Sequence, residues 1–332
     1  MFPFVSLFSS TLILGSFISI SSTHWITLWL GLELNLLSFI PLMFYSATKS
    51  SAEAAFKYFI AQAMGSSLLL LGPFFILYSP FFMPFPWMNL LIFMGIFIKL
   101  GLPPSHFWLP SVMMSLTWPL CLILMTWQKL IPLSLLFFTL NLTYSPLVFF
   151  WVLVIALIGG IGGLNQTQLR PLLAYSSITH MSWLLAASIT SSSSAVLYYM
   201  VYVSTSALLI LMLWSQNLAS ISSMSLSPYK NLFSPYITLL LIMTLSGLPP
   251  TLGFFPKWLV MEMSTPHSFL MILTLLLGSI LSLFYYLNLM FMSLMTSKES
   301  CKPPFVTFLA TLPMTLTLIM SLGVAPSIWL IS

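Results

Sequence analysis

Charge is the scarcest property of this sequence. Only 9 lysines and arginines and 4 acidic residues occur among 332 residues, and none of the acids is an aspartate. A soluble domain carries about 25% charged residues, so these few charges cannot cover a water-exposed surface. With 59% hydrophobic residues and a mean hydropathy of +1.07, the composition predicts an all-α polytopic membrane protein. The net charge of +5 is also too sparse for a nucleic-acid-binding surface.

Signatures of cofactor binding are missing as well. Cys121 and Cys301 belong to no CxxC pair, so neither a disulfide nor a metal role is expected. No predicted helix carries two histidines, which argues against a b-type haem. The glycine-rich stretch 159–168 lacks the GK[ST] of a phosphate loop, and its small-residue spacing favours helix packing. The chain is therefore predicted to hold no metal and no redox cofactor.

Long apolar runs predict eleven transmembrane helices, because about 20 apolar residues cross the hydrocarbon layer. The N-terminal run lacks a basic region and a cleavage site, so it is predicted to be a span rather than a targeting signal. The predicted spans are 3–21, 24–45, 53–78, 87–108, 112–132, 146–164, 171–190, 195–216, 236–262, 268–294 and 304–326.

The loop cations predict an orientation. With eleven spans, the links on the side of the N-terminus hold every loop lysine and arginine, and the opposite links hold none. Cytoplasmic or matrix loops carry such an excess, so the N-terminus is predicted on that side and the C-terminus on the other. The loop cations are Lys49, Arg170, Lys230, Lys298 and Lys302.

One proline motif occurs twice. GLPPSHFWLP at 101–110 aligns with GLPPTLGFFP at 247–256, on predicted spans of opposite direction. This indicates an inverted repeat of 1–132 and 146–294, plus an additional helix at 304–326, in one membrane domain. Two unrelated proline kinks are the alternative. Matched breaks in inverted halves point to transport sites. The breaking residues are Pro103, Pro104, Pro249 and Pro250.

Charged residues inside the spans are the candidate functional groups. Each costs on the order of 3 kcal/mol at the bilayer centre, so they must face the protein interior, pair with each other, or contact water. A low dielectric disfavours a charged lysine, and a nearby carboxylate favours it. A lysine beside a glutamate can therefore take up and release a proton as its neighbour's charge changes. The four residues are Glu33, Lys99, Lys129 and Lys257.

Three further residues are candidates for a supporting polar path. Lys57 lies near a helix end with Glu53 one turn before it, so the alternative is an ion pair that reaches the headgroups. His180 lies in the middle of a predicted span, and the alternative for it is a hydrogen-bonded core histidine.

Five segments carry a resemblance to a known family. HWITLWLGLELNLLSFIPLM (24–43), EAAFKYFIAQA (53–63), KLGLPPSHFWLP (99–110), NQTQLRPLLAYSSITHMSWLL (165–185) and SGLPPTLGFFPKWLV (246–260) occur in this order. They resemble the subunit 2 family of mitochondrial NADH dehydrogenase, the antiporter-like membrane subunits of respiratory complex I. The resemblance implies a fourteen-helix fold without its first three helices, which agrees with eleven spans and an N-terminus in the matrix.

The resemblance also implies roles for the intramembrane charges. Glu33 and Lys99 match the family's glutamate–lysine pair, Lys129 its central lysine, and Lys257 the lysine on the second broken helix. His180 matches a histidine of supporting role. One departure from repeat symmetry is visible, because Lys99 precedes its GLPP motif whereas Lys257 follows its own.

Partners and location follow from the same resemblance. It implies proton translocation in the mitochondrial inner membrane, coupled to partner subunits that hold NADH, FMN, iron–sulfur clusters and ubiquinone. Expected neighbours are subunits 4 and 4L, the long lateral helix of subunit 5, accessory subunits, and structural lipids such as cardiolipin. Two other hypotheses stay open: a free-standing sodium/proton antiporter, which the absence of aspartate disfavours, and a structural subunit with inert ion pairs.

Overall fold

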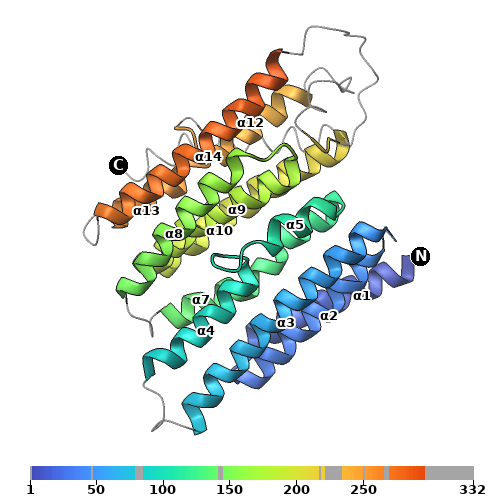
Figure 1. Ribbon diagram of the computed structural model, residues 1–332, viewed down its shortest axis with the longest axis vertical. Helices are drawn as coiled ribbons and strands as arrows, with labels where there is room; N and C mark the ends of the chain where they lie inside the picture. The colour runs from blue at the N-terminus through green and yellow to red at the C-terminus, as the bar shows by residue number, and fades with distance from the viewer. Residues whose placement is uncertain are drawn as a thin grey trace. The chain divides into compact units, whose positions relative to one another are not determined.

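The computed structural model describes residues 2–45, 48–78, 85–140, 145–216, 218–220, 234–249, 251–264 and 269–295 (Figure 1). These residues form helices joined by turns and short irregular stretches, and their one β-type pairing is an isolated bridge between Gln168 and Ser220, which confirms the all-α prediction. Seven described helices are long and apolar enough to cross a membrane. The count of eleven stays a prediction, because the last predicted span, 304–326, lies outside the described residues together with Lys230, Pro250, Lys298, Cys301 and Lys302.

The first compact unit comprises Met1–Ile155. Helix α2 packs between α1 and α3, and α3 also contacts α4 and α5, which are the two halves of the helix that breaks at the first GLPP motif. Helix α7 packs against α4 and α6. The elements are α1 (Phe2–Ser21), α2 (Trp25–Phe44), α3 (Lys49–Tyr78), α4 (Phe85–Leu100), α5 (Trp108–Ser115), α6 (Trp118–Met125), α7 (Trp127–Leu140) and the first part of α8 (Ser145–Leu164).

The second unit begins at Ala156, within α8. Its centre is α9, which contacts α10, α13 and α14 and is buried along most of its length. Helix α12 packs against α10 and α14. The elements that follow α8 are α9 (Leu169–Thr190), α10 (Ser192–Gln216), α12 (Ser234–Ser246), α13 (Phe254–Ser264) and α14 (Phe269–Met295).

Both GLPP motifs end a helix in the same way. Gly101 and Gly247 adopt φ angles of +71° and +75°, in the left-handed region. In the first break, the N–H of Gly101 donates to Ile98 O at 3.1 Å and the N–H of Leu102 to Phe97 O at 2.9 Å. In the second, the N–H of Gly247 donates to Thr244 O at 3.2 Å and the N–H of Leu248 to Met243 O at 3.5 Å. This is the Schellman pattern, for which glycine is the preferred residue.

The two breaks also share a hydroxyl hydrogen bond and the same spacing from the glycine to the next helix. Ser105 donates its hydroxyl to Leu102 O at 3.3 Å, and Thr251, which aligns with it, donates to Leu248 O at 2.8 Å. The second half of each broken helix begins seven residues after its glycine, at Trp108 and at Phe254. The local geometry of the motif is thus shared between the units.

The predicted limits of the fourth and fifth spans were wrong. The fourth span was expected to end at 108 and the fifth to cover 112–132, but α5 continues to Ser115 and the next helix begins at Trp118. Leu116 and Thr117 are extended, and a proline lies in the first turn of α6. Proline is favoured in the first turn of a helix because its missing N–H has no partner there. As a result Lys129 lies in the first turn of α7, near the middle of the apolar run Trp118–Thr139.

The glycine at the first break provides a test of this geometry. We expect Gly101→Ala to destabilise the chain by roughly 1–2 kcal/mol, because a Cβ is strained at positive φ and would lie 2.9 Å from Leu109 Cδ1. The measurement is the unfolding midpoint of the purified full-length chain in detergent. Phe107→Leu, at a neighbouring position that is 72% exposed, is the control. Equal midpoints for the two variants would contradict the assignment.

Candidate functional site

Lys99 lies in the last turn of α4, two residues before Gly101, and only 6% of it is exposed. Two side chains donate to backbone carbonyls of this last turn. Gln62 of α3 donates from Nε2 to Lys99 O at 3.2 Å, and Trp108 of α5 donates from Nε1 to Ile98 O at 3.1 Å. The C-terminal end of α4 is therefore hydrogen-bonded to side chains of both α3 and α5.

Lys99 and Lys129 line the same cavity. It has a volume of about 10 Å³, which is roughly the space that one water molecule needs. Lys129 is only 3% exposed. The structure thus brings together two of the predicted lysines around a small space that is lined by further polar side chains and by three leucines. The lining residues are Tyr58, Gln62, Lys99, Leu100, Trp108, Leu109, Leu124, Gln128 and Lys129.

A chain of hydrogen bonds connects this cavity to α2. Tyr58 donates its hydroxyl to Gln128 Oε1 at 3.3 Å, and Gln128 donates from Nε2 to Asn35 Oδ1 at 2.9 Å. Asn35 is buried and lies two residues after Glu33. The chain joins three helices around the lysines.

The predicted partner of Lys99 is nearby but not in direct contact. Glu33 lies within electrostatic range of Lys99, half-buried on α2, and no ion pair of 4.0 Å or less joins the two side chains. The Glu33 carboxylate and the Lys99 ammonium therefore lie too far apart to form a salt bridge.

Glu53 and Lys57 lie apart from this cavity. Both are exposed on α3, and they form no ion pair with each other. Neither residue lines the cavity that contains Lys99 and Lys129.

In the second unit, Lys257 binds the end of the broken helix directly. Its Nζ donates to Ser246 O, the last carbonyl of α12, at 2.9 Å, and lies 5.8 Å from the centre of the Trp183 ring. The lysine is 5% exposed. A Cβ on Gly247 would lie 2.8 Å from Nζ, so glycine at this position also makes room for the ammonium.

His180 lies one turn before Trp183 on α9 and is hydrogen-bonded within the core. Its Nδ1 is 2.9 Å from the hydroxyl of Tyr198, and its ring centroid is 5.2 Å from that of Tyr202. Tyr285 and Tyr286 of α14 are buried in the same unit, with ring centroids 4.8 Å apart. The unit thus contains a group of buried tyrosines from α10 and α14.

Several site residues were missed by the sequence analysis because they carry no charge. An uncharged polar residue inside an apolar run is the signal that could have found them, since such groups form hydrogen bonds between membrane helices. The missed residues are Asn35, Tyr58, Gln62, Trp108, Gln128, Trp183 and Tyr198. Among the described residues, no group of three or more histidine, cysteine or acidic side chains could hold a metal ion.

A protein family matches most of this chain. The family described as NADH:quinone oxidoreductase/Mrp antiporter, transmembrane, matches residues 22–80 and 82–284, so this chain belongs to it. The chain is 40% identical over 294 residues to NADH-ubiquinone oxidoreductase chain 2 of Lumbricus terrestris, covering 88% of this chain and 87% of that one. Chain 2 of Loxodonta africana is 38% identical over 301 residues, covering 88% and 86%. The resemblance to subunit 2 is thereby confirmed.

Solved structures agree on the fold. A chain of respiratory complex I from Thermus thermophilus, solved with bound aureothin, superposes with a TM-score of 0.83 at 24% identity and covers 98% of this chain and 78% of that one. A chain of the Mrp complex from Dietzia sp. DQ12-45-1b gives a TM-score of 0.74 at 15% identity, covering 90% and 61%. The fold is that of the antiporter-like subunits.

The carbonyl contact of Trp108 can be tested separately from charge. We expect Trp108→Phe to destabilise the full-length chain by about 0.5–1.5 kcal/mol, the net contribution of one hydrogen bond, because Ile98 O loses the indole donor and keeps only the N–H of Gly101. Trp214→Phe, on a side chain that is 49% exposed, is the matched control. Unfolding midpoints in detergent give the comparison, and a Trp108→Phe midpoint no lower than that of the control would show that the contact is not needed.

Proposed function

We propose that this chain is a membrane-arm subunit of a proton-translocating NADH:ubiquinone oxidoreductase and that its buried Glu/Lys residues carry protons. The observation that carries the proposal is the cavity shared by Lys99 and Lys129, with amide side chains around it. A proton carrier needs a neighbour within hydrogen-bond reach or one water away. A cavity with room for about one water between two lysines supplies that condition.

The relay has four members in this proposal. Glu33 is the acidic partner of Lys99, and Lys99 exchanges a proton with Lys129 through the cavity. Lys257 serves the second unit, where Ser246 O and the Trp183 ring hold its ammonium. His180 with Tyr198 provides a supporting polar path there. The chain itself performs no redox step; NADH oxidation and quinone reduction belong to partner subunits.

The proposal also covers the membrane, the orientation and the neighbours of the chain. The chain is a multi-pass protein of the mitochondrial inner membrane with its N-terminus in the matrix, and its two broken helices belong to an inverted five-helix repeat. The shared geometry at Gly101 and Gly247 supports the repeat. Subunits 4 and 4L, the lateral helix of subunit 5 and accessory subunits are its proposed neighbours. Co-purification with NADH oxidation activity distinguishes this assignment from a free-standing sodium/proton antiporter.

Substitutions at Lys99 separate a proton carrier from an inert charge. We expect Lys99→Gln and Lys99→Arg each to lower proton pumping and coupled NADH oxidation of the assembled complex by about a hundredfold or more, the scale of a lost proton-transfer group. Arginine keeps the positive charge but does not deprotonate in proteins. Pumping is measured as dye quenching in proteoliposomes, with Lys49→Gln, at the exposed start of α3, as the control. Wild-type pumping in Lys99→Arg would favour the structural hypothesis.

The hydrogen-bond chain beside the cavity has its own test. Gln128→Met keeps both lysines and removes the bonds to Tyr58 and Asn35. We expect a partial loss of pumping, smaller than that of Lys99→Gln, because the groups that orient the cavity water are lost while the carriers remain. Gln166→Met, which removes only a 3.4 Å bond to Gly162 O, is the control. Unchanged pumping in Gln128→Met would exclude this glutamine from the path.

A further inference from the structure

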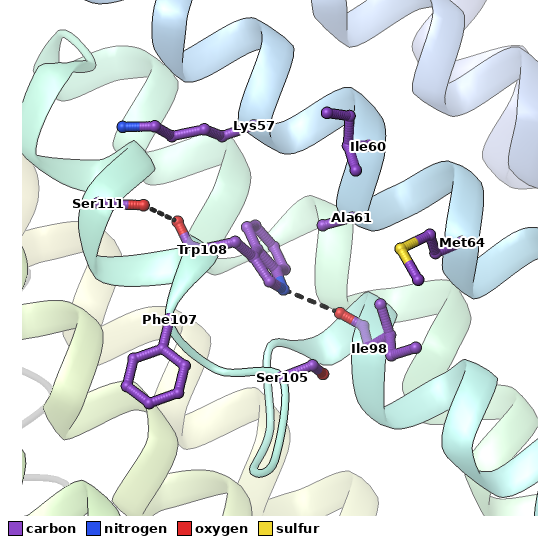
Figure 2. A pocket seen from close by; sticks show the side chains of 9 residues that line it. All are labelled: Lys57, Ile60, Ala61, Met64, Ile98, Ser105, Phe107, Trp108 and Ser111. Atoms are coloured by element: carbon purple, nitrogen blue, oxygen red, sulfur yellow. Dashed lines mark hydrogen bonds between the residues drawn. The ribbon is translucent and has the colours of Figure 1, made fainter.

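An open groove runs along the outside of α3 and α5; it shares one lining residue, Trp108, with the lysine cavity. It has a volume of about 430 Å³, within the range of roughly 300–1,000 Å³ for small-molecule sites. Figure 2 shows that its walls are mostly apolar, with Ile60 and Met64 from α3, Ile98 at the end of α4, and Phe107 beside the break. Phe107 is 72% exposed and Met64 58% exposed. The groove therefore opens to whatever surrounds the chain in the membrane.

One end of the groove carries a positive charge. Lys57 and Ser111 lie at this end in Figure 2. Lys57 is exposed and has neither a hydrogen bond nor an ion pair with any described residue, although Glu53 lies one turn before it. It is eight residues after Lys49, the first residue of α3, which is about 12 Å along a helix axis. Lys57 therefore lies nearer the Lys49 end of α3 than the Tyr78 end, and its long stem allows the ammonium to extend toward that end.

The hydroxyl oxygen of Ser111 is available at this end as a hydrogen-bond acceptor. Ser111 already donates its hydroxyl to Trp108 O at 2.9 Å, so its oxygen offers lone pairs to the groove. A ligand that fits this end therefore has an anionic group for Lys57 and a hydroxyl or other donor for Ser111. Next to these polar groups, the ligand has an apolar chain that packs against the apolar walls of the groove.

We propose that this groove is a binding site for an anionic, glycerol-headgroup phospholipid. The phosphate lies at Lys57, a headgroup hydroxyl donates to Ser111, and an acyl chain follows Ile60, Met64 and Phe107. A basic pocket between transmembrane helices is suited to such lipids because an uncompensated cation is costly in the membrane. A helix of another subunit would have to neutralise Lys57 with an acidic side chain, and the experiment below distinguishes this occupant.

The test uses the assembled complex in lipid nanodiscs. Phosphatidylglycerol and phosphatidylcholine that carry the same photoreactive acyl chain are compared, and adducts on residues 57–64 and 105–111 are quantified by mass spectrometry. We expect phosphatidylglycerol to label these segments about fivefold more than phosphatidylcholine, the factor for about 1 kcal/mol per lysine at an anionic headgroup. Lys57→Gln should bring the ratio close to one, and Lys57→Arg should restore it.

Matched variants keep the result interpretable. Lys49→Gln removes an exposed lysine of the same helix outside the groove and should leave the ratio unchanged. Ser111→Ala, which leaves the charge in place, should lower the ratio by less than Lys57→Gln. Equal labelling by the two lipids, or a ratio that Lys57→Gln does not change, would overturn the proposal. Absence of adducts from both lipids would also overturn it, by showing that a protein partner covers the groove.

Discussion

The fold depends on how the carbonyl groups at two interrupted helices are satisfied away from water. A helix end leaves its last carbonyls without partners, and an unpaired polar group in an apolar interior costs several kcal/mol. Gly101 and Gly247 turn the chain so that backbone N–H groups reach some of these carbonyls. Side chains from elsewhere also donate to these helix ends: Gln62 and Trp108 in one unit, Lys257 in the other. The breaks therefore determine which polar residues gather beside them.

This requirement explains why charge and proline occur together in so apolar a chain. In a continuous helix the backbone N–H and C=O groups bond to each other, so no carbonyl is left to bind the ammonium of a buried lysine. An interrupted helix leaves carbonyl oxygens, and the residues that bind those oxygens create a polar surrounding in which an ammonium is tolerated. In the first unit the surrounding is shared by two lysines from α4 and α7. In the second it is provided by the α12 carbonyl and an aromatic ring.

The parts of this arrangement that depend on local chemistry could be predicted from the sequence. Lys99, Lys129 and Lys257 stand out because a charge is costly in any apolar span. The breaks stand out because glycine and proline interrupt a helix at their own positions. The contacts between Gln62 and Lys99 O, or between Gln128 and Asn35, join residues 37 and 93 positions apart, so no local pattern specifies them. The boundary at Leu116–Thr117 was missed because hydropathy hardly changes there, and only Pro119 marks it.

The different ways in which the two units use lysine have a consequence for mutational work on this family. Around Lys99 the backbone carbonyls are bound by Gln62 and Trp108, so the side chain can be replaced while the helix end keeps its partners. Lys257 is at once the titratable group and the donor to Ser246 O. Its removal therefore alters charge and helix termination together, and a loss of activity at this position is ambiguous in a way that a loss at Lys99 is not. Only substitutions that retain a donor of similar reach isolate the contribution of charge in the second unit.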